Sequence, residues 1–193
     1  MLKTLVVLVA AYLLGSIPVA YLLVRKAYGR DIRRIGSRNV GGMNVARHVS
    51  FGLGLLTICL DMAKGILALL LAKYWAGTTA ALVLAPALVI AGDIWPVFLG
   101  FRGGKGLAAG FGSLLVVNGW LAFWVCFAMG MVVILSRNAD LAVLVACILL
   151  PFLSWWQLGG FGWFFFGVLV ALPVVARLWS PPGRTLHYRF LSH

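Results

Sequence analysis

The sequence has few acidic residues and few charged residues of either sign. Four Asp and Glu residues stand against sixteen Lys and Arg, so 10% of the 193 residues carry a formal net charge of +12. In a soluble protein this basic excess would suggest nucleic-acid binding. However, 63% of the residues are hydrophobic, more than the roughly half found in soluble domains, and the mean hydropathy is +1.06. The composition therefore excludes an ordinary soluble domain, and no nucleic-acid partner is predicted.

The sequence also lacks the spacing of a disulfide framework or a metal site. Its three cysteines, Cys59, Cys126 and Cys147, lie in apolar segments without paired spacing or a nearby histidine. Disulfide frameworks and zinc sites require paired cysteines or Cys/His clusters. We therefore expect the cysteines to be small buried hydrophobic side chains, and we predict no metal and no cofactor.

Long apolar runs replace the alternating pattern that a transmembrane β-barrel would show. Most runs approach twenty residues, the length that a helix needs to cross the hydrocarbon of a bilayer. They cover residues 1–24, 51–72, 78–99, 107–135, 141–158 and 161–176. This pattern predicts an all-α integral membrane protein: a polytopic bundle of about seven transmembrane helices, some of them short, in one membrane-embedded domain over residues 1–193.

Two of these runs are irregular. In the first, Gly15 and Pro18 predict a kink, because proline removes a helical hydrogen bond. The run 107–135 has 29 residues, more than one comfortable crossing needs and fewer than the roughly forty of two crossings. Two short helices that turn near Asn118–Gly119 would place almost all basic residues on one side. By the positive-inside rule the N-terminus is then outside and the C-terminus cytoplasmic.

The segment 29–47, GRDIRRIGSRNVGGMNVAR, lies between the first two runs and is called the opening loop below. Membrane topology explains its arginines, because cytoplasmic loops are rich in Lys and Arg. It does not explain the serine and asparagines interleaved with glycines. Glycine lets backbone N–H groups approach an anion, and arginine supplies fork-shaped donors for phosphate. We therefore interpret the opening loop as a ligand-binding segment that uses Ser37, Asn39, Gly41, Asn44 and Arg47.

Two further motifs place charge within or beside apolar runs. In D-x-x-K-G, Asp61 and Lys64 are three residues apart, so they share a helix face and can neutralise each other. An ionisable pair within a membrane run is equally a functional hypothesis. In GFRGGKG, residues 100–106, glycines surround Lys105 at the start of a helix. Free N–H groups, the positive end of the helix dipole and an ammonium group make a compact anion site.

An ordered set of motifs in this chain resembles those of the bacterial acyl-phosphate:glycerol-3-phosphate acyltransferase family, known as PlsY. The set reads GSIP, GRDIR, GSRN, GGMNVAR, DMAKG and GDIWPVFLGFRGGKGLA, and it covers roughly residues 12–115. The resemblance implies a seven-helix bacterial inner-membrane enzyme of phospholipid biosynthesis. Such an enzyme transfers an acyl chain from acyl phosphate to the 1-hydroxyl of glycerol 3-phosphate at the cytoplasmic face, giving lysophosphatidate and phosphate. It uses no metal and no thioester donor.

The motif chemistry and the resemblance together suggest roles for ten residues. Those expected to be catalytic are Lys105, Arg47 and Ser37. Those expected to bind substrate are Asn39, Gly41, Asn44, Asp61, Lys64, Gly103 and Gly104. The asparagines either bind the glycerol hydroxyls or hold the loop, and the proton of the attacking hydroxyl goes either to a substrate phosphate oxygen or to Asp61. The expected partners are glycerol 3-phosphate, acyl phosphate and membrane lipid, with no obligate protein partner.

Two other functions remain open at this point. A transporter or flippase for an anionic lipid or small anion also uses intramembrane charges and broken glycine-rich helices, and an inactive homologue is the third possibility. The chain departs from the usual family pattern at seven positions. In the resemblance, the usual residues are GSGN and GATN in the opening loop, then a histidine, a serine and a final His-x-x-Asn, where this chain has Arg38, Gly42, Met43, Asp93, Asp140, Arg177 and Ser180.

Overall fold

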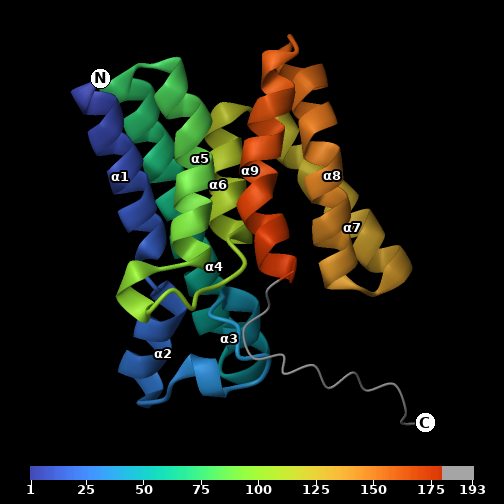
Figure 1. The fold of residues 1–193 in the computed structure, drawn as a ribbon. Helices are drawn as coiled ribbons and strands as arrows, with labels where there is room; N and C mark the ends of the chain where they lie inside the picture. Colours follow the sequence, from blue (N-terminus) through green and yellow to red (C-terminus); the bar gives the residue numbers. More distant parts are fainter. Residues whose placement is uncertain (180–193) are drawn as a thin grey trace.

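A computed structural model describes residues 1–179 as a bundle of helices (Figure 1). Ser180, one of the departures from the family pattern, lies outside the described residues. The elements in chain order are α1 Leu2–Ser16, α2 Val19–Tyr28, η1 Ile32–Arg34, α3 Gly42–His48, α4 Phe51–Leu70, η2 Leu71–Ala76, α5 Thr79–Ile94, η3 Val97–Leu99, α6 Leu107–Val117, α7 Gly119–Ser136, α8 Ala139–Leu158 and α9 Gly162–Trp179. Residues 1–179 contain no β-strand, which confirms the prediction of an all-α protein.

Six helical segments in the described part of the chain are long and apolar enough to cross a membrane, and α6 is a shorter seventh apolar helix. The 11 residues of α6 extend about 16 Å, roughly half of a bilayer's hydrocarbon thickness. The predicted turn in the run 107–135 is confirmed: α6 ends at Val117, and the side chain of Asn118 caps α7 by accepting a hydrogen bond from the Leu121 N–H at 3.1 Å.

The predicted kink in the first run is a complete break between α1 and α2. The break lies at Ile17 and Pro18, because proline lacks the N–H that would continue the helical ladder. Carbonyl groups at the end of α1 therefore lose their helical partners and need other donors. This break places polar backbone groups at membrane depth, where only protein groups can satisfy them.

Two helix pairs approach each other through glycine. In the pair α1 and α5, a Cβ on Gly15 would collide with the Val89 carbonyl oxygen, and one on Gly92 would collide with the Tyr12 carbonyl oxygen. In the pair α4 and α6, a Cβ on Gly65 would collide in the same way with the Ala109 carbonyl oxygen. Small residues allow membrane helices to pack backbone against backbone. The glycines thus hold α1 against α5 and α4 against α6.

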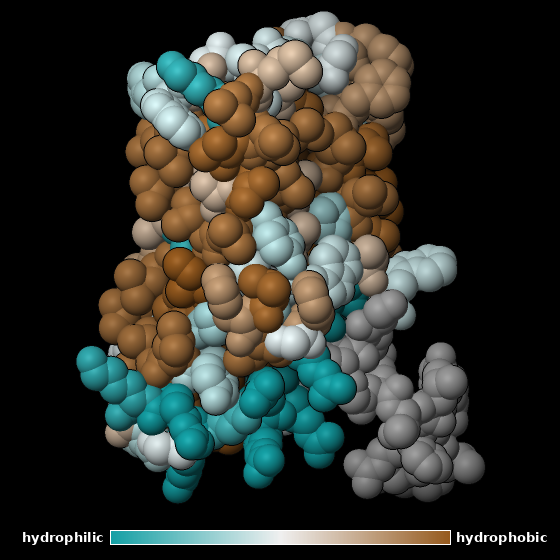
Figure 2. Space-filling view, turned by 60° about the vertical axis from the view of Figure 1, so that its left-hand side comes forward, coloured by the Kyte–Doolittle hydropathy of each residue, from teal (hydrophilic) through white to brown (hydrophobic). Residues whose placement is uncertain are grey.

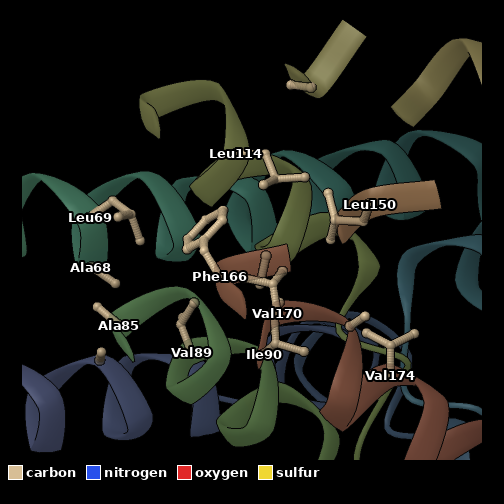
Figure 3. Close-up of a cluster of buried hydrophobic side chains, with 14 of the residues drawn as sticks. Ala68, Leu69, Ala85, Val89, Ile90, Leu114, Leu150, Phe166, Val170 and Val174 are labelled. Carbon is tan, nitrogen blue, oxygen red and sulfur yellow. The ribbon is translucent and has the colours of Figure 1, made fainter. Parts of the chain in front are cut away.

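Apolar side chains from seven of the described α-helices and η2 fill the centre of the bundle, and Figure 3 shows part of this cluster. Phe166 and Val170 of α9 lie among Val89 and Ile90 of α5, and all four are nearly or fully buried. Other members of the cluster come from α1, α4, η2, α6, α7 and α8. Side-chain packing of this kind, rather than avoidance of water, holds membrane helices together.

The surface divides into an apolar band and a hydrophilic end. Figure 2 shows hydrophobic side chains over most of the height of the molecule and hydrophilic ones gathered at the lower end. The opening loop lies at this end (Figure 1), whereas Thr4 and Thr78, whose hydroxyls are 3.0 Å apart, lie at the opposite end with the N-terminus. The clustering of charge agrees with the predicted topology, and the sidedness of the termini relative to a membrane remains a prediction.

The prediction that the three cysteines are buried is wrong. Cys59 and Cys126 are exposed on the outer surface of the bundle and Cys147 is partly exposed, and all three are free thiols. The prediction applied a rule for water-soluble proteins, in which small apolar side chains are buried away from water. In a membrane bundle the outer face meets lipid, so an apolar residue has no need to be inside.

Candidate functional site

The second half of the opening loop is the short helix α3, which the sequence analysis did not predict. Asn44 lies on this helix, is 4% exposed and uses its whole amide group to hold the loop. Its Nδ2 donates to the carbonyls of Ile35 and Asn39 at 3.0 and 2.9 Å, and its Oδ1 accepts from the Ser37 N–H at 3.0 Å. Of the two roles expected for Asn44, the structure shows the one of holding the loop.

Three residues of the opening loop have left-handed backbone conformations: Gly29, Gly36 and Arg38. Gly36 has φ +54°, and a Cβ there would come within 2.6 Å of the Asn44 Oδ1. Arg38 has φ +61° although it has a Cβ, a conformation that costs about 1–2 kcal/mol for such a residue. The glycine that the family resemblance places at position 38 would adopt this backbone without that cost.

Asp31, the acidic residue of the opening loop, forms an ion pair with Arg33 of the same loop. Asp31 begins η1, accepts a hydrogen bond from the Arg33 N–H and ion-pairs with the Arg33 guanidinium at 2.7 Å. These bonds from Arg33 lower the pKa of the Asp31 carboxyl below its usual range. Asp31 therefore stays ionised and neutralises Arg33.

The glycine-rich turn before α6 has a fixed backbone. The Gly103 N–H donates to the Ile94 carbonyl at 3.0 Å and the Gly104 N–H to the Asp93 carbonyl at 2.9 Å. The Asp93 carboxylate accepts from the Gly106 N–H at 3.1 Å. The N–H groups of Gly103 and Gly104, expected to face a phosphate, therefore close the turn onto the end of α5 in this structure.

Arg177 of α9 holds the same turn from the other side. It is buried, and its Nε and Nη2 donate to the carbonyls of Gly104 and Gly103, each at 2.9 Å. A planar guanidinium can engage two neighbouring carbonyls in this way, whereas a lysine acts as a point charge. The turn is thus clamped between α5 and α9.

The opening loop and the glycine-rich turn lie against each other. A Cβ on Gly104 would lie 2.7 Å from the Val40 carbonyl oxygen and 3.0 Å from the Asp93 Oδ2. Only a residue without a side chain permits this approach. The two motifs, about sixty residues apart in sequence, therefore form one surface at the hydrophilic end of the bundle.

Beneath this surface, Lys64 is the centre of a buried polar cluster. Its Nζ donates to the Gly15 and Ile17 carbonyls at 3.0 Å each and to the Asp93 Oδ1 at 2.8 Å. The Asp61 Oδ1 lies 2.9 Å from the same nitrogen. The predicted pairing of Asp61 with Lys64 is confirmed, and Lys64 also satisfies carbonyls that the break between α1 and α2 leaves open.

The space beside this cluster is small. A cavity of about 10 Å³ lies between Asp61, Asp93, Gly103 and the residues of the helix break. That volume corresponds to about one water-sized probe. Asp61 and Lys64 therefore lie within the bundle and support the surface above them, and their predicted contact with substrate remains a prediction.

Charged and polar side chains remain accessible above the cluster. Ser37 and Arg47 are exposed, and Asn39 and Gly41 are partly exposed. The Lys105 side chain is 34% exposed and forms an ion pair with Asp140 at the start of α8. In the described part of the chain, no three His, Cys, Asp or Glu side chains gather as a metal site would require.

The sequence analysis did not foresee how Asp93, Asp140 and Arg177 meet at the glycine-rich turn. Each had been noted only as a departure from the family pattern. The scarcity of acidic residues in the sequence was a usable signal for these contacts. All four aspartates of this chain form ion pairs, with Arg33, Lys64 or Lys105. In an apolar protein an unpaired carboxylate is costly, so each acid indicates a nearby cation.

Comparisons with known proteins agree with this geometry. The family model described as glycerol-3-phosphate acyltransferase matches residues 5–187. A glycerol-3-phosphate acyltransferase of Synechococcus sp. (strain CC9902) is 40% identical over 178 residues, which cover 92% of this chain and 88% of that protein. Glycerol-3-phosphate acyltransferase 2 of Moorella thermoacetica is 43% identical over 149 residues, covering 77% of this chain and 76% of the relative.

Solved structures show the same fold. The crystal structure of PlsY (YgiH), an integral membrane glycerol 3-phosphate acyltransferase, in its glycerol 3-phosphate form has a TM-score of 0.79 and 30% identity over 90% of this chain and 87% of that chain. Its lysophosphatidic acid form has a TM-score of 0.76 and 28% identity over the same shares. With a family model that spans nearly the whole sequence and relatives at about 40% identity, the chain belongs to the glycerol-3-phosphate acyltransferase family.

Proposed function

We propose that this protein transfers an acyl chain from acyl phosphate to the 1-hydroxyl of glycerol 3-phosphate, releasing lysophosphatidate and phosphate. The observation that carries the proposal is the contact between Val40 of the opening loop and Gly104 of the glycine-rich turn. This contact joins both polar motifs of the sequence into one surface at the end of an apolar bundle. We further propose that the bundle lies in a bacterial inner membrane with this surface facing the cytoplasm.

Lys105, Arg47 and Ser37 are the proposed catalytic groups. Their side chains are exposed or partly exposed at the hydrophilic end, and cations with a hydroxyl donor match the two phosphates that meet in this reaction. Acyl phosphate is already an activated mixed anhydride, so positioning and charge stabilisation supply most of the catalysis. Gly103, Gly104 and Asn44 contribute by fixing the backbone, and Asn39 and Gly41 are partly exposed on either side of Val40, which contacts the glycine-rich turn.

The reaction also has to move one proton. The glycerol hydroxyl forms a bond to the acyl carbon, the bond from that carbon to the phosphate oxygen breaks, and the hydroxyl proton leaves. Asp61 was one expected acceptor, but it is buried, paired with Lys64 and bordered by a cavity of about 10 Å³. A phosphate oxygen of the substrate is therefore the proposed acceptor, since it is carried to the reacting hydroxyl by the substrate itself.

The test uses purified protein in nanodiscs with palmitoyl phosphate and radiolabelled glycerol 3-phosphate. We expect labelled lysophosphatidate and inorganic phosphate in equal amounts, no product with palmitoyl thioester, and a loss of turnover in Lys105→Ala and Arg47→Ala. Turnover that survives both substitutions contradicts the proposed site. No product with any acyl phosphate, together with lipid movement across vesicles, would instead support a transporter.

A further inference from the structure

The ion pair between Lys105 and Asp140 connects the proposed phosphate site to a distant helix. Asp140 lies in the first turn of α8, where the Asn138 side chain accepts hydrogen bonds from the N–H groups of Asp140 and Leu141 at 3.0 and 3.1 Å. The Asp140 side chain is 54% exposed and that of Lys105 is 34% exposed. Both groups can therefore exchange partners with a ligand from solution without disrupting buried structure.

The glycine-rich turn does not depend on this ion pair for its shape. Arg177 binds the carbonyls of Gly103 and Gly104, and Asp93 accepts from the Gly106 N–H. These contacts fix the backbone on both sides of Lys105. The partner of the Lys105 ammonium group therefore affects its availability for a ligand and not the fold of the turn.

We infer that Asp140 is an internal counter-ion of Lys105 that competes with the substrate phosphate and so sets the affinity of the site for phosphate monoesters. This inference rests on the proposed function. A carboxylate and a phosphate both bind the Lys105 ammonium group as anionic acceptors. Glycerol 3-phosphate must either displace the Asp140 carboxylate or bind beside it against like-charge repulsion. Either route weakens binding, and a neutral side chain at position 140 would not.

The size of the effect follows from the exposure of the pair. Exposed ion pairs contribute about 0–1 kcal/mol, which corresponds to at most about a fivefold change in an equilibrium constant. Asp140→Asn and Asp140→Ser should therefore lower KM for glycerol 3-phosphate by roughly two- to fivefold. The constant for competitive inhibition by inorganic phosphate should fall by the same factor, with kcat within about twofold of the wild type.

Three variants and two measurements test this inference in nanodiscs. Asp140→Glu keeps the charge and should retain the wild-type KM. Asp31→Asn removes another carboxylate, partly buried and paired with Arg33, and serves as the control for a general gain of positive charge. Equilibrium binding of radiolabelled inorganic phosphate to each variant is measured alongside turnover, so the inference can be judged even if the wild type shows no acyl transfer.

The outcomes separate the inference from the proposed function. Tighter phosphate binding in Asp140→Asn but not in Asp31→Asn supports an internal counter-ion. Unchanged phosphate binding and KM in Asp140→Asn, or equal changes in both variants, overturn it. A higher KM in Asp140→Asn also overturns it, because Asp140 would then orient Lys105 for the substrate. Absence of turnover in the wild type counts only against the proposed function.

Discussion

The two motif lysines have similar surroundings in sequence and opposite ones in space. Lys64 precedes a glycine in D-x-x-K-G and is 7% exposed, with two carboxylates and two carbonyls around its ammonium group. Lys105 precedes a glycine in GGKG and is 34% exposed, with one exposed carboxylate. A buried cation with a complete set of partners holds structure, whereas an accessible one with a single exchangeable partner can bind a ligand. The predictions below test this division.

The largest effect is expected for Lys64→Met. The substitution leaves the carboxylates of Asp61 and Asp93 and the open carbonyls of the helix break without their shared donor. Removing one partner of a buried ion pair costs about 3–5 kcal/mol. We expect a sharp loss of folded protein in detergent, measured by size-exclusion chromatography and thermal unfolding. Lys73→Met, at an exposed lysine of η2, is the control and should behave as the wild type.

The same substitution at the second lysine, Lys105→Met, should leave the fold intact. Loss of an exposed ion pair changes stability by about 1 kcal/mol or less, so Tm should stay close to that of the wild type. Acyl transfer should fall by about 100-fold or more, as is typical when a charge-stabilising group is removed from an active site. A large drop in Tm together with the loss of activity would place Lys105 in the same structural class as Lys64.

An intermediate effect is expected for Arg177→Gln, which weakens the clamp on Gly103 and Gly104. Hydrogen bonds from a charged group contribute about 1.5–3 kcal/mol, so Tm should fall less than in Lys64→Met. KM for glycerol 3-phosphate should rise because the turn that presents Lys105 loosens. Arg177→Lys keeps the charge without the planar fork and should fail to restore KM; full restoration would show that charge alone holds the turn.

The smallest effect is expected for Arg38→Gly in the opening loop. Glycine removes the strain of the left-handed backbone, about 1–2 kcal/mol. It also destabilises the folded state by about 0.5–1 kcal/mol, because glycine loses more conformational entropy on folding. The balance predicts a gain in stability of about 0–1.5 kcal/mol, seen as a small rise in Tm with acyl transfer within about twofold. A fall in Tm would mean that the Arg38 side chain stabilises the loop by more than its backbone costs.

Much of the fold could be predicted because the membrane constrains it strongly. Local sequence features indicate where helices form and where they end. These features are the apolar runs of helical length, the proline at position 18 and the asparagine at position 118. The helices, the break and the turn near Asn118 all occur where these residues predict them. The helix α3 was missed because glycine and asparagine favour loops locally, while the buried Asn44 side chain stabilises helix and loop together.

Burial of the cysteines could not be predicted because the rule for soluble proteins does not hold in lipid. An apolar side chain in a membrane helix can face the core or the acyl chains at similar cost. Composition therefore does not indicate which side of α4, α7 or α8 faces inward. In α4, the close approach of Gly65 to α6 and the ion pairs of Lys64 decide this.

For this protein the sequence alone determines the membrane class, the apolar runs and the two polar motifs, since hydropathy, proline and glycine act over a few residues. The tertiary structure decides which charge meets which. It pairs Lys64 with Asp93 and Lys105 with Asp140, 29 and 35 residues away, and brings Arg177 to a turn 73 residues earlier. Pairings at such separations depend on which helices pack together, because a buried charge accepts whichever partner the packing supplies.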